Sequence, residues 1–220
     1  YNNLYKDIKK GEKILIDDGK IILKVSDIDK KNQIIAEVIQ GGMLSSNKGF
    51  NLPNTNISQP ALTKKDIDDA IFSAKQNVDW IALSFVRSSS DYDLVKSKIK
   101  NLGYDTPVMA KIEKWEAVNN AKKIINSFDA VMVARGDLGV EVPSEKVPLI
   151  QKKIIEKARE AGKPVVIATQ LLDSMIERPV PTRAEISDIA NSIFDGADAL
   201  MVTGETAIGK HPKRVIKVLL

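Results

Sequence analysis

Short apolar runs alternate with longer amphipathic segments along most of the chain after residue 60. Five apolar runs, each four to seven residues long, begin at Asp79, Pro107, Ala130, Pro164 and Ala199. Runs of this length are typical of strands that are buried on both faces. Successive runs start 28, 23, 34 and 35 residues apart, which leaves room for helical structure between them. The pattern therefore predicts parallel strands joined by helical crossovers.

The segments between the predicted strands have the periodicity of helices with one apolar face. A first helix is expected after Thr63, whose side chain is suited to cap an N-terminus. The other helices are expected over residues 88–103, 115–128, 144–162, 181–196 and from 211 onward.

Residues 12–52 have a different pattern, in which short apolar stretches are separated by turn residues. Two predicted strands, 13–16 and 20–25, flank Asp17-Asp18-Gly19, a strong signal for a hairpin turn. We therefore expect residues 1–58 to form a small β-rich domain that acts as a lid or an insertion.

Polar side chains follow each of the five predicted strands. They are Ser84 and Arg87, Lys111 and Glu113, Arg135 and Asp137, Thr169 and Gln170, and Thr203 and Glu205. A (β/α)8 barrel has its active site at the C-terminal ends of its strands, whereas an open doubly wound sheet has it at one switch point. The regularity favours an α/β fold in which residues 59–220 form part of a (β/α)8 TIM barrel. About five βα units are present, which is too few to close eight strands.

Lys111 and Glu113 lie two residues apart on one predicted strand, so their side chains point to the same face. Burying two charges there is unfavourable unless they are paired or bound to a ligand. A structural ion pair explains the spacing, but Asp137 at the next strand end suggests a second role. Glu113 and Asp137 could share a divalent cation such as Mg²⁺, with Lys111 as a point charge for a phosphoryl group.

Glycines at positions 136 and 139 bracket Asp137. They permit either an ordinary turn or the start of a short helix whose free N–H groups could hold a carboxylate or phosphate. Thr169 offers a hydroxyl at the next strand end. Together these residues predict a metal-assisted reaction on a small anionic substrate.

Composition excludes several other classes of function. The net charge of +4 comes from scattered lysines, and only 5% of residues are aromatic, so neither a basic stripe nor a base-stacking surface for nucleic acid is expected. No apolar run reaches the roughly 18–20 residues that span a membrane. The chain has no cysteine, which favours a reducing compartment such as the cytoplasm. The lone histidine, His211, precedes Pro212 at a predicted helix start, where a structural role is expected.

Arg135-Gly136-Asp137 is also the tripeptide that integrins bind on extracellular adhesion proteins. That function requires an exposed loop on an extracellular protein. The apolar run before Arg135 and the absence of cysteine and of a signal-peptide pattern disfavour it.

Five long segments together resemble the pyruvate kinase family. They are MAKIEKWEAVNN, MVARGDLGVEVPSEKVPLIQKKII, GKPVVIATQLLDSM, RPVPTRAEISDIANSIFDGADA and VTGETAIGKHP. In the N-terminal part, IDDGKI and NKGFNLP resemble the mobile lid domain of the same family. The resemblance covers essentially all 220 residues in the family's order.

The resemblance implies a glycolytic phosphotransferase that converts phosphoenolpyruvate and ADP to pyruvate and ATP. It implies Mg²⁺ (or Mn²⁺) and K⁺ as cofactors, and a homo-oligomer, usually a tetramer. No nucleic-acid or membrane partner is expected.

Site residues carry over from the family by motif. Lys111 would contact the transferring phosphoryl group, and Glu113 and Asp137 would hold the Mg²⁺. Backbone N–H groups at Gly136 and Asp137, with Thr169, would bind the substrate carboxylate. The proton that converts the enolate to pyruvate is expected to pass through a threonine and water, with Thr169 as a candidate.

The resemblance assigns the remaining candidates to the lid and to the rim of the site. Lys48 and Asp18 in the lid would contact the nucleotide or lie on the face that closes over the site. Ser84, Thr203 and Glu205 would line the site.

The resemblance also implies that the family's first three barrel strands and its C-terminal domain lie outside these 220 residues. Those strands carry an arginine for the phosphate and the K⁺ ligands. We therefore expect the 220-residue chain alone not to turn over phosphoenolpyruvate. The alternative interpretation is a metal-dependent aldolase or lyase barrel that forms an enolate from a pyruvate-type substrate and needs neither the lid nor Lys48.

Overall fold

The computed structural model describes the chain except for residues 1–2, 18, 47, 54, 56 and 59–61. It divides into two compact units, which are described separately. The first contains residues 1–60 with 139–144, and the second contains residues 61–138 with 145–220.

The first unit is built on a four-stranded antiparallel sheet with the strand order β3-β2-β1-β4. Its elements are α1 (Leu4–Asp7), β1 (Lys13–Ile16), β2 (Ile21–Ile28), β3 (Ile34–Gln40) and β4 (Phe50–Asn51). Strands β1 and β2 form the predicted hairpin, in which Ile16 pairs with Ile21. Four buried side chains form the core of this unit: Ile8, Ile14, Val25 and Leu52.

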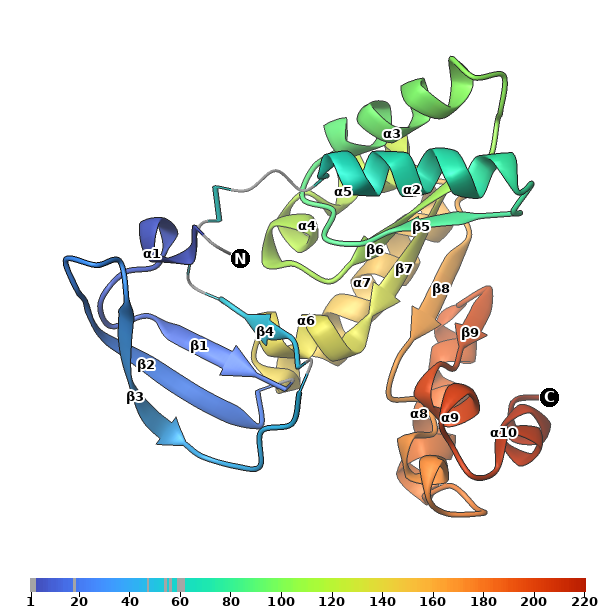
Figure 1. Cartoon of the computed structure of the whole chain (residues 1–220). Coiled ribbons are helices and arrows are strands. Elements are labelled where there is room, and N and C mark those ends of the chain that lie inside the picture. The colour runs from blue at the N-terminus through green and yellow to red at the C-terminus, as the bar shows by residue number, and fades with distance from the viewer. Residues whose placement is uncertain (1–2, 18, 47, 54, 56, 59–61) are drawn as a thin grey trace. The chain divides into compact units, whose positions relative to one another are not determined.

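The second unit is an α/β structure around a five-stranded parallel sheet (Figure 1). Its strands are β5 (Ile81–Leu83), β6 (Val108–Ile112), β7 (Ala130–Ala134), β8 (Val165–Ala168) and β9 (Ala199–Met201). They pair in sequence order, β5-β6-β7-β8-β9, and every pairing is parallel. The predicted parallel strands with crossover connections are therefore confirmed.

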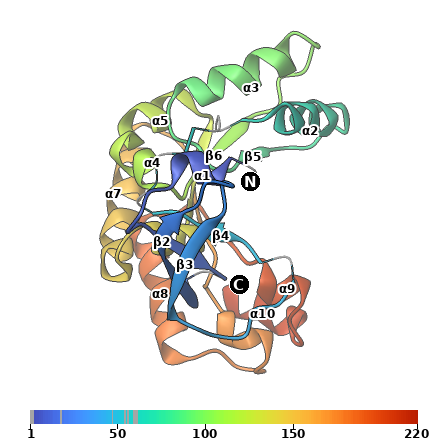
Figure 2. The same cartoon turned by 60° about the vertical axis from the view of Figure 1, so that its left-hand side comes forward.

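One helix of this unit precedes the strands and the others lie between or after them. The helices are α2 (Lys64–Lys75), α3 (Ser90–Lys100), α4 (Trp115–Asn119), α5 (Ala121–Ser127), α6 (Arg135–Glu141), α7 (Val147–Glu160), α8 (Arg183–Asp195), α9 (Gly204–Ala207) and α10 (Pro212–Leu219), with short 3₁₀ turns at Ser144–Lys146 and Asp173–Ile176. Residues 139–141 of α6 are counted in the first unit. Figure 2 shows α5, α7 and α8 following one another along one side of the sheet. Every residue of β7 is buried, as expected for a parallel strand whose side chains are covered on both faces of the sheet.

The prediction of a single helix over residues 115–128 is wrong. This segment is two helices, α4 and α5, which meet at Asn120 with φ −94° and ψ 8°. The Asn120 side chain donates a hydrogen bond to the backbone oxygen of Arg87 at 2.9 Å. Asparagine favours such breaks because its side chain competes for backbone hydrogen bonds.

Two helices begin with a capping box, in which side chains and backbone N–H groups satisfy each other. Thr63 and Asp66 form the box of α2, and Thr182 and Glu185 form that of α8. Within the described part of the chain, no helix has the length and apolar character needed to cross a membrane.

Candidate active site

The C-terminal end of β6 brings together an ammonium, a carboxylate and a hydroxyl. The Lys111 Nζ lies 2.9 Å from Glu113 Oε2 and donates a hydrogen bond to Ser84 Oγ at 2.8 Å. Lys111 and Glu113 lie at alternate positions, so both project to one face while Ile112 between them is fully buried. Ser84 directly follows β5, the neighbouring strand. The parallel pairing of β5 and β6 is therefore what places the hydroxyl beside the lysine.

Glu113 is a buried carboxylate, with only 1% of its surface exposed. Its Oε1 accepts a hydrogen bond from the Phe85 backbone N–H at 2.6 Å. Burial raises the pKa of Glu113 above its usual 4.5, and the charge of Asp137 raises it further. The Lys111 ammonium and the Phe85 N–H act in the opposite direction but do not cancel the effect of burial.

The environment of Glu113 fits a divalent cation. Its Oε2 is completely buried and has the Lys111 ammonium as its charge partner, yet it accepts no well-directed hydrogen bond from the described residues. Asp137 lies close enough for its charge to affect Glu113. No group of three or more His, Cys, Asp or Glu side chains with the geometry of a metal site occurs among the residues described. Two carboxylates are nevertheless a usual protein contribution to a Mg²⁺ site, where waters and substrate supply the other ligands.

Asp137 is presented by the turn of chain from β7 into α6. The short helix suggested by the glycines is present and begins at Arg135, directly after the last strand residue. The Gly136 N–H does not point to open space, because it donates to Thr169 Oγ1 at 2.7 Å. A Cβ at position 136 would lie 3.4 Å from that same oxygen. Glycine thus permits the backbone of α6 to lie against the Thr169 side chain.

Thr169 follows β8 and faces the start of α6. Its hydroxyl donates to the Ala168 backbone oxygen at 2.6 Å while accepting from Gly136. Thr169 and Gln170 both have left-handed backbone conformations, with φ 70° and φ 54°. That conformation costs about 1–2 kcal/mol for a residue with a side chain. Two consecutive residues of this kind indicate that surrounding contacts hold the strand end in place.

Arg135 makes those contacts and was not assigned a role from the sequence. It is the last charged residue before Asp137 and is only 8% exposed. Its guanidinium donates to the backbone oxygens of Thr169 and Gln170 and forms an ion pair with Asp188 of α8. The available signal was that a charged residue directly follows a fully buried strand and therefore needs buried partners.

Thr203 and Glu205 lie at the end of β9. Thr203 is exposed, whereas Glu205 is 2% exposed. The Glu205 carboxylate accepts hydrogen bonds from the backbone N–H groups of Leu172 and Thr203, at 3.1 and 3.0 Å. Its two oxygens therefore tie the segment after β8 to the segment after β9.

Lys48 and Asp18 belong to the first unit. The Lys48 ammonium forms an ion pair with Asp17 at 2.9 Å, and this hydrogen bond is the main reason that the pKa of Asp17 lies below its usual 3.8. Asp18, the other predicted lid residue, lies outside the described residues.

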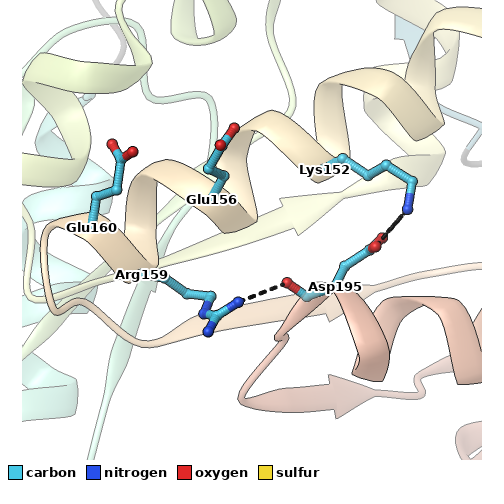
Figure 3. A pocket seen from close by; sticks show the side chains of 5 residues that line it. All are labelled: Lys152, Glu156, Arg159, Glu160 and Asp195. Atoms are coloured by element: carbon cyan, nitrogen blue, oxygen red, sulfur yellow. Dashed lines mark hydrogen bonds and ion pairs between the residues drawn. The ribbon is translucent and has the colours of Figure 1, made fainter.

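A separate groove of about 550 Å³ lies on the helical side of the second unit. Five charged residues line it: Lys152, Glu156, Arg159, Glu160 and Asp195 (Figure 3). Figure 3 shows the Lys152 side chain pointing to the Asp195 carboxylate and that of Arg159 to the Asp195 backbone oxygen. All of these residues except the half-buried Asp195 are exposed, and none comes from a strand end, so the groove is not assigned to the predicted chemistry.

A parallel α/β sheet whose strand ends gather a lysine, a buried glutamate and a nearby aspartate places this chain in the class of α/β enzymes. Residues 1–216 match the family model described as pyruvate kinase, barrel domain. The chain belongs to the pyruvate kinase family.

Comparison with individual proteins gives the same family. The chain is 55% identical over 219 residues to a pyruvate kinase of Corynebacterium glutamicum and 51% identical over 219 residues to one of Mycobacterium tuberculosis. It is 49% identical over 220 residues to pyruvate kinase 2 of Synechocystis. Each comparison covers all of this chain, but only 46%, 46% and 37% of the respective relatives. The chain thus spans less than half the length of these curated relatives.

Proposed function

We propose that this chain contributes the strand ends of a phosphoryl-transfer site that, together with the family's other barrel strands, converts phosphoenolpyruvate and ADP to pyruvate and ATP. The observation that carries the proposal is the Lys111 ammonium, held between Ser84 Oγ and the buried Glu113 carboxylate at a strand end. In this reaction the bond between phosphorus and the enol oxygen breaks, and an ADP β-phosphate oxygen forms a new bond to phosphorus. The enolate that remains takes a proton at its methylene carbon and becomes pyruvate.

Lys111 is proposed to stabilise negative charge on the phosphoryl group during transfer. A lysine is a compact point charge, and its side chain here is only 23% exposed, so little water screens it. Ser84 and Glu113 hold the ammonium from two sides and restrict its position before substrate binds.

Glu113 and Asp137 are proposed to hold Mg²⁺ or Mn²⁺. When bound, the cation would neutralise charge on the substrate oxygens. The buried Glu113 Oε2, which accepts no well-directed hydrogen bond, supports this role. The K⁺ that the family uses is proposed to bind to residues outside the five strand ends.

Thr169 and the backbone at Gly136 and Asp137 are proposed to form the side of the site that receives the substrate carboxylate. The Gly136 N–H donates to Thr169 Oγ1 in this structure, so Thr169 fixes the position of that backbone. A threonine hydroxyl in this position is also proposed to take part, with water, in delivering the proton to the enolate.

The finer architecture belongs to the same proposal. Residues 59–220 would form part of a (β/α)8 barrel, and residues 1–58 would be a lid whose Lys48 and Asp18 contact nucleotide phosphates. Ser84, Thr203 and Glu205 would line the site, and the protein would work as a cytoplasmic homo-oligomer, such as a tetramer. The sequence-ordered parallel sheet and the separate antiparallel unit support the division into a barrel part and a lid.

The proposal is tested by replacing Lys111 with methionine in the protein that carries this sequence. Formation of ATP from phosphoenolpyruvate and ADP is followed with Mg²⁺ and K⁺ present. We expect kcat to fall by about a hundredfold to a thousandfold, because one preorganised charge at the reacting group is lost.

Lys152→Met is the matched control. Lys152 is also paired with a carboxylate, Asp195, but on the exposed helical groove, with 52% of its side chain exposed. Its replacement should leave kcat within about twofold. Phosphoryl transfer at an undiminished rate in the Lys111 variant would contradict the assignment.

A further inference from the structure

Arg135 uses its guanidinium to hold the chain segment that carries Thr169. Its Nη2 donates to the backbone oxygens of Thr169 and Gln170, both at 2.9 Å, and its Nε donates to the Thr169 oxygen at 3.2 Å. Its Nη1 forms an ion pair with the Asp188 carboxylate. A planar guanidinium presents several donors at fixed angles, which a lysine ammonium cannot reproduce.

The segment that Arg135 holds is one that would otherwise relax. Thr169 and Gln170 have φ angles of 70° and 54°, and a β-branched residue such as threonine is especially unfavourable there. Arg135 binds the carbonyl groups of these same two residues. The guanidinium therefore stabilises the left-handed backbone at the position where the strand ends.

The consequence of this backbone is the placement of the Thr169 hydroxyl. Oγ1 lies 2.7 Å from the Gly136 nitrogen and 2.6 Å from the Ala168 oxygen, so its hydrogen bonds fix its direction. Arg135 directly precedes Gly136 in the chain and also binds the backbone of Thr169. It therefore helps to place both partners of the hydrogen bond from Gly136 to Thr169. Asp188 balances the charge of the buried guanidinium, whose side chain is 9% exposed.

We propose that Arg135 is a positioning residue that acts through Thr169: it fixes the Thr169 side chain and, through the bond from Gly136, the start of α6, the segment proposed to lie beside the substrate carboxylate. This inference rests on the proposed function. Arg135 itself does not contact substrate, because protein groups occupy its guanidinium.

The experiment combines Arg135→Lys with Thr169→Val in a double-mutant cycle. In the protein that carries this sequence, Arg135→Lys should raise KM for phosphoenolpyruvate or lower its kcat/KM by about tenfold to a hundredfold. KM for ADP should stay within about twofold. In the Thr169→Val background, Arg135→Lys should cause less than about a threefold further loss, because the group through which it acts is already absent.

Arg159→Lys is the matched control, since Arg159 also donates to a backbone oxygen, that of Asp195, but in the exposed groove. It should leave all these constants within about twofold. Fully additive losses in the cycle, or an equal rise in KM for ADP, would overturn the positioning role. If Arg135→Lys does not fold, Asp188→Asn replaces it in the same cycle. A smaller loss of kcat/KM for phosphoenolpyruvate is expected, and additive losses or an equal rise in KM for ADP would again overturn the positioning role.

Deuterium exchange tests the same inference without activity. In Arg135→Lys, peptides covering residues 131–142 and 165–172 should exchange at least about tenfold faster, while a peptide covering 13–28 keeps its rate. Unchanged exchange would overturn the inference even in an active enzyme. An unmutated protein that makes no ATP from these substrates would instead refute the proposed function, and the exchange result would still decide whether Arg135 holds this segment.

Discussion

Phe85 has φ 57°, a left-handed conformation that is rare for a residue with a bulky side chain. This conformation directs its N–H to Glu113 Oε1 at 2.6 Å. The residue is 47% exposed, and the Lys114 ammonium lies 5.8 Å from the centre of its ring. The strained backbone at this residue is therefore compensated by a hydrogen bond to a buried carboxylate.

Glycine should be better tolerated than alanine at position 85. A left-handed φ costs alanine about 1 kcal/mol and glycine almost nothing, so Phe85→Gly should be about 1 kcal/mol more stable than Phe85→Ala. Denaturant unfolding of the two variants measures the difference.

Phe72 in the middle of α2 provides the opposite case, because it is 64% exposed and helical. There the glycine variant should be about 1 kcal/mol less stable than the alanine variant. The same order at both positions would contradict the role of backbone strain at Phe85.

The contacts of some site residues could be predicted from the sequence, whereas those of others could not. The two-residue spacing of Lys111 and Glu113 predicted that they share a face, and their 2.9 Å contact agrees with that. The role of Arg135 was not predictable, because its partners include backbone oxygens 34 and 35 residues away. Every residue type has a backbone oxygen, so the sequence does not show which oxygens Arg135 binds.

Helix α8 begins with a capping box that reaches beyond the helix. The Glu185 carboxylate accepts hydrogen bonds from the N–H and hydroxyl groups of Thr182 and of Ser174, at 2.6 to 2.9 Å. Burial is the largest single influence and raises the pKa of Glu185, but these four hydrogen bonds outweigh it and leave the pKa below its usual 4.5.

Because the pKa of Glu185 is lower in the folded than in the unfolded protein, its ionised form stabilises the fold. Glu185→Gln should therefore lower stability at pH 7 by about 1 kcal/mol, the usual worth of a helix cap. This contribution is present above pH 4.5 and is lost as pH falls through the folded-state pKa, so the two proteins should converge in acid. Thermal unfolding across this pH range measures it.

Glu156→Gln on the exposed groove is the control for this helix cap. It should change stability by less than about 0.5 kcal/mol at any pH. A Glu185→Gln difference that persists unchanged below the folded-state pKa would contradict the role of the ionised carboxylate.

At the scale of elements, the strands were easier to predict than the helix boundaries. The observed strands begin at most two residues after the predicted starts, because a short apolar run between turn residues has few alternatives. The break between α4 and α5 was missed because the Asn120 side chain binds the backbone of Arg87, which is distant in sequence.

At the scale of the whole molecule, each unit has its own buried core. Val25, 1% exposed, packs with Ile8, Ile14 and Leu52 in the first unit. Val133, fully buried, lies in the parallel sheet of the second unit. The two units are therefore expected to open independently in local unfolding.

Val25→Ala tests this independence. Loss of two buried methyl groups should destabilise the first unit by about 2 kcal/mol, so its slowest amides should exchange roughly thirtyfold faster. Amides of β6 to β8 should keep their rates. Val133→Ala should have the reverse effect, and faster exchange throughout the chain in either variant would contradict independent cores.

The parallel order of the second sheet followed from the repeat of strand and helix, which allows few other topologies. The antiparallel hairpin of the first unit followed from its turn residues. What the pattern did not contain is the set of contacts between strand ends, such as the Gly136 bond to Thr169, since these depend on how neighbouring strands align.

The Lys111–Glu113 ion pair would make the two proposed binding events, of a divalent cation and of an anion, thermodynamically linked. A dication that takes Glu113 Oε2 and an anion that takes the Lys111 ammonium both compete with the same 2.9 Å contact. The first ligand would weaken this contact while Ser84 still holds the ammonium, and the second ligand would then meet a charge that is less tightly paired. Each ligand would therefore raise the affinity for the other by the same factor, which is heterotropic cooperativity at one strand end. In the absence of both, the two charges neutralise each other, so either ion alone would be expected to bind weakly.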